Sequence, residues 1–202
     1  MPYKIAAIIL AAGRSERMGA DNKLLADIGG KPMVSHVVEN VVQSGANPII
    51  VVTGHEAEIV KKILSNQSLE FVENPNYTNG LSTSLKAGIE ALGGDVDACL
   101  ICLADMPLVT SDTLKALMAA FAPDEGKSIC VPIHENQQGN PILWGRAHFP
   151  DLMKLSGDQG AKPLLADNPA AIAKVEAGPE VLRDADHAAA LAALRREMGN
   201  GH

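Results

Sequence analysis

Aromatic residues are scarce in this chain, since phenylalanine, tryptophan and tyrosine make up 3% of its 202 residues. No apolar run approaches the roughly 18–20 residues that a membrane-spanning helix needs. Residues 1–12 lack the basic segment and the small-residue cleavage site of a signal peptide. These absences predict a cytoplasmic protein that does not bind a membrane. The 47% of hydrophobic residues is enough for one sizeable core, so we expect a single domain over residues 1–202.

Cysteine is also rare, with Cys99, Cys102 and Cys130 as its three occurrences. An odd number of cysteines in apolar surroundings favours a reducing compartment over a disulfide framework. Cys99 and Cys102 fall in one predicted strand, where residues three apart point to opposite faces. We therefore interpret them as core residues and not as a zinc or redox site.

Positive charge is in deficit: 17 lysines and arginines stand against 24 acidic residues, for a net charge of −7. This balance argues against a nucleic-acid-binding surface. A polyanionic substrate would then need a local cationic pocket, together with a divalent metal ion.

Such a pocket is predicted near the N-terminus. Residues 5–12 form a continuous apolar run typical of a strand buried on both faces, and a glycine-bounded loop follows over residues 13–19. Arg14, Arg17 and Lys23 lie in or just after this loop, where glycine lets the backbone approach a ligand closely. The spacing matches neither the dinucleotide fingerprint nor the P-loop. The pattern predicts a polyphosphate site; the alternative is an ordinary turn with solvated basic side chains.

The rest of the chain alternates between strand and helix patterns. Strands are expected over residues 48–53, 69–72, 98–104, 128–133 and 171–175, and helices over 33–44, 56–65, 83–92, 111–122, 146–155, 160–166 and 187–198. This order predicts an α/β fold with a mostly parallel sheet covered on both faces. Ligands of such folds bind at the carboxyl ends of the strands.

Two polar residues follow these predicted strands in informative places. Asp105 comes directly after an apolar strand, a costly position for a carboxylate unless it has a partner such as Mg²⁺. The alternative for Asp105 is a turn or helix-capping role. Ser82 can cap the helix at 83–92 and leave the helix amides facing the same pocket; the alternative is a plain cap without a ligand.

Several motifs resemble those of one enzyme family. The segment Leu10-Ala-Ala-Gly13-x-Ser-x-Arg17-Met-Gly-x-x-x-Lys23 resembles the signature loop of small nucleotidyltransferases that join an NTP to a phosphorylated acceptor. A second signature is Leu103-Ala-Asp105-Met-Pro-Leu-Val109. The segment from Asn74 to Ser84, Asn-Pro-x-Tyr-x-x-Gly-Leu-x-x-Ser, resembles the branch that acts on the molybdenum cofactor with CTP.

The resemblance implies a Rossmann-like three-layer α/β/α fold and a molybdenum-cofactor cytidylyltransferase-like activity. This activity would be Mg-dependent, would move CMP from CTP to the phosphate of a molybdopterin-type acceptor and would release pyrophosphate. Arg17 and Lys23 would hold the triphosphate, and Asp105 would bind the metal. Ala12 stands where GTP-using relatives carry glycine, which favours CTP. A molybdoenzyme or its chaperone is a possible protein partner.

The resemblance also distributes the remaining residues between two subsites. On the nucleotide side it places Leu10, Ala11, Ala12, Gly13, Arg14, Ser15, Lys23, Thr53, Gly80, Ser82, Ser84 and Asp105. On the acceptor side it places Asn140, Pro141, Asp158 and Lys162. Asn140 and Pro141 would belong to an antiparallel element. Asp158 and Lys162 lie in a Gly-Asp-x-Gly-x-Lys loop, whose alternative is an ordinary turn before the helix at 160–166.

The second metal ligand is assigned to Asp186. Relatives carry Asp-x-Asp/Asn-Thr-Pro here, whereas this chain has His187 and Ala188 after the acidic residues. Asp184 is the competing ligand, and a solvated acidic turn is the other alternative. If Asp105 and Asp186 bind one Mg²⁺, their carboxylates must converge at the carboxyl edge of the sheet.

Two other functions remain open. One is a nucleotidyltransferase with a different phosphorylated acceptor, such as a sugar phosphate. The other is a nucleotide-binding regulatory or maturation factor without turnover. Retention of Arg17, Lys23 and Asp105 argues against the second, whereas the altered segment around Asp186 argues slightly for it.

Overall fold

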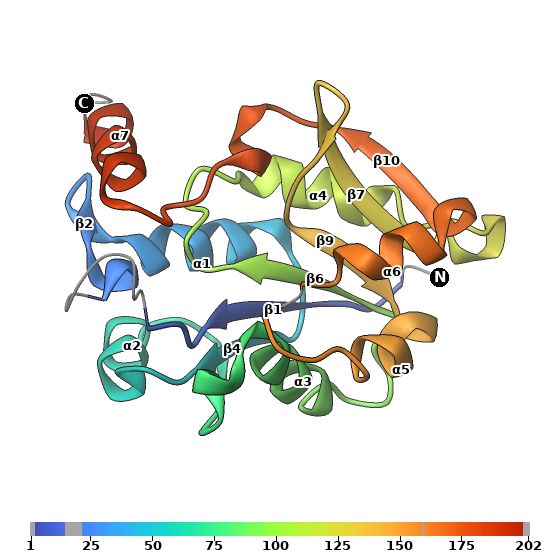
Figure 1. Ribbon diagram of the computed structural model, residues 1–202, viewed down its shortest axis with the longest axis horizontal. Helices are drawn as coiled ribbons and strands as arrows, with labels where there is room; N and C mark the ends of the chain where they lie inside the picture. Colours follow the sequence, from blue (N-terminus) through green and yellow to red (C-terminus); the bar gives the residue numbers. More distant parts are fainter. Residues whose placement is uncertain (1–2, 15–21, 159, 200–202) are drawn as a thin grey trace.

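The computed structural model describes residues 3–14, 22–158 and 160–199. The apolar run near the N-terminus forms strand β1 (Ile5–Ala11), which lies inside the main sheet (Figure 1). Over the described residues this sheet has eight strands, including the short β8 (Gln137–Gln138), which pairs with β7. The other strands follow the order β10 (Ile172–Glu176), β7 (Ile129–His134), β9 (Ile142–Gly145), β6 (Ala98–Leu103), β1, β4 (Ile49–Thr53) and β5 (Glu70–Glu73).

Most described strand pairs of the main sheet are parallel, as predicted. β1 pairs in parallel with β4 and β6, and parallel pairs also join β4 to β5 and β7 to β10. β9 runs antiparallel to both β6 and β7. Asn140 and Pro141, expected in an antiparallel element, lie directly before this strand. The carboxyl ends of β1, β4 and β6 therefore lie at one edge of the sheet.

Helices cover both faces of the sheet. One face packs against α1 (Met33–Ser44), α2 (Ala57–Ile63) and α4 (Ser111–Ala119), and the other against α3 (Leu81–Glu90), α5 (Phe149–Leu152) and α6 (Lys162–Asp167). Side chains of a strand alternate between its faces, so Ile9 joins the first core and Ile8 the second. Cys102 and Cys99 divide between the two cores in the same way. The predicted three-layer α/β/α fold is confirmed.

A third, smaller core joins the two ends of the chain. The hairpin of β2 (Asp27–Ile28) and β3 (Lys31–Pro32) packs against α7 (Ala188–Gly199), as Figure 1 shows. Its buried residues are Ile28, Met33, Ala185, Leu191 and Leu194. No helix of the described ranges is long and apolar enough to cross a membrane.

Two local expectations were wrong. The helix expected over 146–155 is a 3-10 turn, Arg146–His148, followed by the short α5; Pro150, which has no amide hydrogen, fits only in the first turn of a helix. Helix α3 begins at Leu81 with Gly80 as its N-cap, and Ser82 lies buried inside its first turn.

Candidate active site

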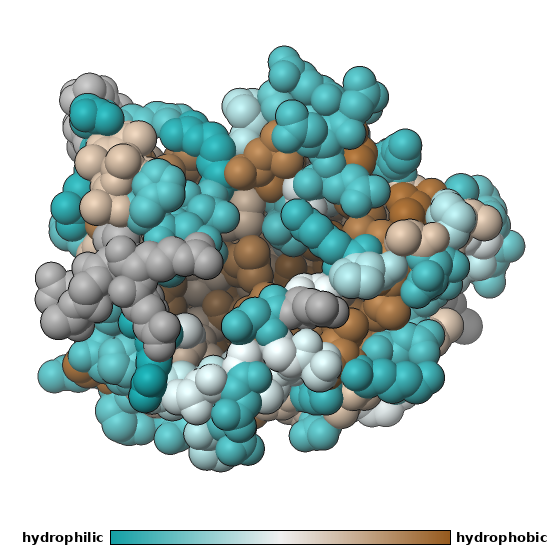
Figure 2. Space-filling view, in the orientation of Figure 1, coloured by the Kyte–Doolittle hydropathy of each residue, from teal (hydrophilic) through white to brown (hydrophobic). Residues whose placement is uncertain are grey.

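A cleft of about 500 Å³ opens at the carboxyl ends of β1 and β6. Figure 2 shows this face of the molecule hollowed near its centre, with hydrophobic residues at the base and hydrophilic residues around much of the rim. The predicted site residues that line the cleft are Leu10, Ala12, Gly13, Arg14, Lys23, Gly80, Ser84, Asp105, Asp158 and Asp186. Leu24, Tyr77, Thr78, Leu81, Leu103 and Asp184 complete its lining.

Lys23 lies between two carboxylates in the wall of this cleft. Its Nζ is 2.7 Å from Asp105 Oδ2 and 2.7 Å from Asp186 Oδ1. The lysine is placed by a 3-10 turn, Lys23–Leu25, in which the Asn22 side chain accepts a hydrogen bond from the Leu24 amide. The two aspartates that the sequence analysis assigns to a metal ion therefore face one point, and the Lys23 ammonium occupies that point.

Backbone contacts set the relative positions of the two aspartates. The Ala185 amide donates to the carbonyl oxygen of Asp105 at 3.0 Å, and the Ala185 side chain is fully buried in the third core. The Asp184 carboxylate accepts a hydrogen bond from the Asp186 amide at 3.2 Å. Asp186 therefore faces Lys23 directly, whereas the described contact of Asp184 supports the backbone of Asp186.

The electrostatics of the cluster follow from its partial burial. Burial lowers the pKa of Lys23, but Asp105 and Asp186 more than offset this effect, so the pKa lies above its ordinary value. Burial raises the pKa of Asp105; the Lys23 ammonium offsets part of this rise, while Asp186 and Asp184 add to it. Lys23 is thus held as a cation, and the carboxylate of Asp105 depends on a nearby positive charge.

Another part of the cleft lining depends on two residues that the sequence analysis did not single out. Asn74 is buried, and its side-chain amide donates to the hydroxyl oxygens of Thr83 and Ser84 at 2.8 and 3.0 Å. The Tyr77 ring packs so closely on Gly54 that a Cβ there would lie 2.7 Å from the ring. The Arg14 guanidinium lies 5.6 Å from the centre of the Tyr77 ring. The Asn-Pro-x-Tyr motif was the available signal for both residues.

The N-terminus of α3 does not present its first amides to the cleft as expected. The Leu81 amide donates to the Asp158 carboxylate at 3.2 Å, and the Ser82 amide donates to the Gly157 carbonyl at 3.1 Å. Gly80 has a φ of +103°, and a Cβ there would lie 2.5 Å from the backbone of Gly157. The loop around Asp158, which was assigned to the acceptor, is therefore attached to the start of α3. The Asp158 carboxylate caps this helix.

Removing this cap gives a local prediction. Asp158→Ala is expected to speed hydrogen–deuterium exchange several-fold at the start of α3, because the Leu81 amide loses its acceptor. Asp158→Asn retains an acceptor oxygen and should leave exchange near the wild-type rate. Mass spectrometry of peptides covering Leu81 measures both variants, with Asp167→Ala on α6 as the control. Equal exchange in the alanine and asparagine variants would contradict a capping role.

Several predicted site residues lie outside the cleft lining. Thr53 is fully buried, and its hydroxyl donates to the Val72 carbonyl. The backbone amide of Asn140 donates a hydrogen bond to the Val181 carbonyl. Lys162 is an exposed residue at the start of α6. Ala11 and Ser82 are buried as well. Ser15 and Arg17 lie outside the described residues, and their roles stay predictions.

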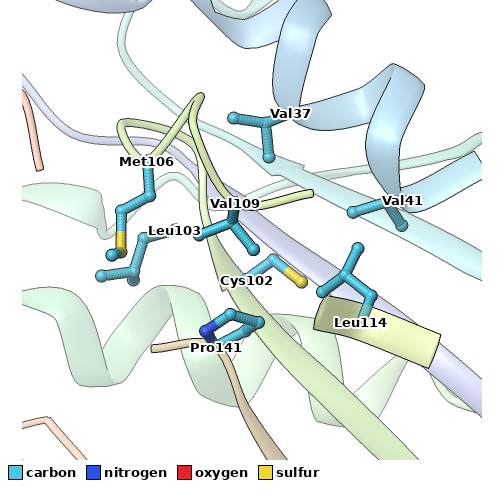
Figure 3. A pocket seen from close by; sticks show the side chains of 8 residues that line it. All are labelled: Val37, Val41, Cys102, Leu103, Met106, Val109, Leu114 and Pro141. Atoms are coloured by element: carbon cyan, nitrogen blue, oxygen red, sulfur yellow. The ribbon is translucent and has the colours of Figure 1, made fainter. Parts of the chain in front are cut away.

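Pro141 lies instead beside a second, much smaller cavity. Figure 3 shows this cavity between α1, β6 and α4, with Val41, Cys102 and Leu114 among its lining side chains. Its volume is about 10 Å³, close to the minimum for one water molecule, and its lining is apolar. It is a packing gap of the first core with no room for a substrate.

The sequence profile of the MobA-like NTP transferase domain matches residues 7–175, which include most of β1, the α3 region that lines the cleft and Asp105. The chain belongs to this family. Asp186 lies beyond the matched residues, so its assignment depends on the geometry described above and on the acidic motif.

Relatives of the MobA-like NTP transferase chain include nucleotidyltransferases of known structure. This chain is 41% identical over 141 residues to the bifunctional protein GlmU of Staphylococcus epidermidis. The match covers 69% of this chain and 30% of that protein. The nucleotidyl transferase Mth528 of Methanothermobacter superposes with a TM-score of 0.84 at 26% identity, covering 96% and 97% of the two chains. A Bacillus anthracis structure named a putative glucose-1-phosphate thymidylyltransferase has a TM-score of 0.77 at 17% identity, with 98% and 96% covered.

Proposed function

We propose that this chain is a Mg²⁺-dependent nucleotidyltransferase that moves CMP from CTP to the phosphate of a molybdopterin-type cofactor and releases pyrophosphate. The observation that carries the proposal is the Lys23 ammonium held between Asp105 and Asp186 in the wall of the cleft. A cation with two carboxylates, in a cleft that Gly13 also lines, suits a metal-bound triphosphate. Family membership supports the reaction class, while the base and the acceptor derive from the sequence motifs.

The donors fit a magnesium ion. One oxygen of each carboxylate lies 2.7 Å from a common point, so a cation there would contact both after a small inward movement. Among the described residues no group of three or more His, Cys, Asp or Glu side chains could hold a metal. The pair of carboxylates suits Mg²⁺, which usually takes one or two carboxylates and completes its shell with phosphate oxygens and water. Bound there, the ion would neutralise charge on the phosphates.

The protein side chains would contribute position and charge. An oxygen of the acceptor phosphate attacks the α-phosphorus, the bond from that phosphorus to the oxygen bridging to the β-phosphate breaks, and pyrophosphate leaves with the electron pair. Lys23 would stabilise the charge that gathers on the pyrophosphate, and we assign the same task to Arg17. No general base is needed, because a phosphate monoester is largely ionised at neutral pH.

A different phosphorylated acceptor is the second candidate. The chain resembles GlmU at 41% identity, and a structure of the same fold is named for glucose-1-phosphate. A sugar phosphate would use the same reacting groups. Pyrophosphate release, measured with each of the four NTPs against molybdopterin and a panel of sugar phosphates, decides between the two acceptors. Absence of release with every pair would contradict a transferase and leave nucleotide binding as the function.

The choice of nucleotide gives a separate prediction. Ala12 lines the cleft directly after β1, and we expect CTP to bind more tightly than GTP in the presence of Mg²⁺. Isothermal titration calorimetry with the four NTPs measures the preference. A clear preference for GTP would overturn the base assignment and leave the reaction class unaffected.

A further inference from the structure

The position of Lys23 bears on how a metal ion could enter the site. Its side chain is 13% exposed and lies 2.7 Å from both Asp105 and Asp186, which are 17% and 40% exposed. The pair of Lys31 with Glu39 on the surface has exposures of 49% and 34%. The contact between Lys23 and Asp105 is therefore less accessible to solvent than that surface pair, and this ionic contact is screened less.

We propose that Lys23 acts as a built-in substitute for the divalent cation, holding Asp105 and Asp186 together until a metal–triphosphate complex displaces it. Metal alone would then bind weakly, and metal and nucleotide would bind cooperatively. This inference concerns the metal site of the proposed function. The part of it that concerns displacement of Lys23 by a metal–nucleotide complex rests on that function.

Competition follows from the geometry. The ammonium group and a cation coordinated by the same two oxygens cannot occupy one point, and each repels the other. For metal to bind, the Lys23 side chain must leave, and its charge then needs another anionic partner. The phosphates of a nucleotide in the same cleft provide one, and the flexible four-carbon stem of lysine permits the movement.

The two carboxylates have a second means of staying in place after the lysine moves. The hydrogen bond from the Ala185 amide to the Asp105 carbonyl ties the two backbone segments together without Lys23. The bond from the Asp186 amide to Asp184 fixes the local turn. Burial of Ala185 against Leu191 and Leu194 in the third core anchors the same segment. The ligand pair is thus prepared for exchange of one cation for another.

The test measures Mn²⁺ binding to the whole chain without any nucleotide, by electron paramagnetic resonance of free Mn²⁺. Lys23→Met removes the competing charge and should bind Mn²⁺ about 10-fold more tightly than wild type, within the 5–150-fold typical of coupled sites. Lys23→Arg keeps a cation and should show little gain. Lys31→Met removes a surface lysine outside the site and serves as the matched control.

A second set of variants shows whether the gain arises at this site. In a Lys23→Met, Asp105→Asn double variant the tighter Mn²⁺ binding should disappear. Lys23→Gln provides an independent neutral variant if the methionine protein does not fold. Tripolyphosphate, used as a probe without metal, should bind more weakly to Lys23→Met than to wild type.

Mn²⁺ affinity that is unchanged or reduced in both neutral variants would overturn the inference, since Lys23 would then only organise the carboxylates. A gain that survives in the double variant would also overturn it. The proposed function fails by a different measurement, the absence of pyrophosphate release. The Mn²⁺ result is independent of that outcome because no nucleotide is present.

Discussion

Replacing Asp105 by asparagine is expected to lower kcat for pyrophosphate release by roughly 10²–10³, the scale seen when one preorganised charge contact is removed. The asparagine has nearly the same shape but no charge, so it would bind Mg²⁺ poorly and would hold Lys23 less firmly. Asp105 is largely buried and hydrogen-bonded to Lys23, so the change acts at the centre of the cluster. A continuous assay of pyrophosphate release with CTP and a phosphorylated acceptor measures it.

Three further aspartates sharpen this test. Asp186→Asn should cause a comparable loss, because Asp186 contacts the same Lys23 nitrogen. Asp184→Asn should do much less, since an amide oxygen can still accept the hydrogen bond from the Asp186 amide. Asp112→Asn, on the exposed face of α4, is the control. If Asp184→Asn abolishes turnover while Asp186→Asn retains it, the second metal ligand is Asp184.

The arrangement of the cluster also changes the expected stability of these variants. From the sequence alone, two converging carboxylates would repel each other, so neutralising one should leave the metal-free protein no less stable or slightly more stable. The structure places the Lys23 ammonium between them, so each carboxylate has an attractive partner. Neutralising Asp105 removes that attraction and also removes the cost of burying its charge. We therefore expect only a small change in the melting temperature.

Gly88→Ala is expected to lower the free energy of unfolding by about 1–3 kcal/mol, the usual cost of overpacking a core. In an ordinary exposed helix the same change would stabilise by up to about 1 kcal/mol. Here a Cβ would lie 2.5 Å from Ile8 Cγ2 and 3.1 Å from Val52 Cγ2. Both residues are fully buried in strands of the sheet and cannot move aside easily.

Urea unfolding followed by circular dichroism measures this change. Gly94→Ala is the matched control, because nothing lies within 4 Å of a Cβ there, and its stability should stay within about 0.5 kcal/mol of wild type. Because α3 also carries Ser84 in the cleft wall, nucleotide affinity should fall with the stability of Gly88→Ala. A Gly88→Ala protein as stable as wild type would show that α3 can move away from the sheet without cost.

Periodicity predicted most of the fold because the forces that decide it are local or depend on burial. Apolar runs such as that of β1 give buried strands wherever they occur, and valines at helical spacing gave α1 its observed limits. The prediction of where α3 starts was wrong because that start depends on residues far away in the sequence. Its cap comes from Asp158, 77 residues away, and the φ of Gly80 suits the contact with Gly157. Neither is visible in the local pattern around Ser82.

In the candidate site too, local sequence patterns predict some residues correctly and miss others. Leu10, Gly13 and Asp105 follow directly from the rule that ligands bind at the carboxyl ends of parallel strands, and all three line the cleft. Thr53 also ends a strand but turns into the core, because the neighbouring β5 provides an acceptor in Val72. The place of Lys23 between two aspartates depended on the packing of the third core. Side-chain periodicity could not predict contacts between segments so distant in sequence.

The pairing of Lys23 with Asp186 spans 163 positions of the chain. During translation Lys23 and Asp105 are both made before Asp186. Asp186 and α7, which packs on the β2–β3 hairpin, follow every described strand of the main sheet. A growing polypeptide can therefore build most of the sheet before the acidic pair exists. The cluster of Lys23, Asp105 and Asp186 can therefore form only after every described strand of the main sheet has been synthesised.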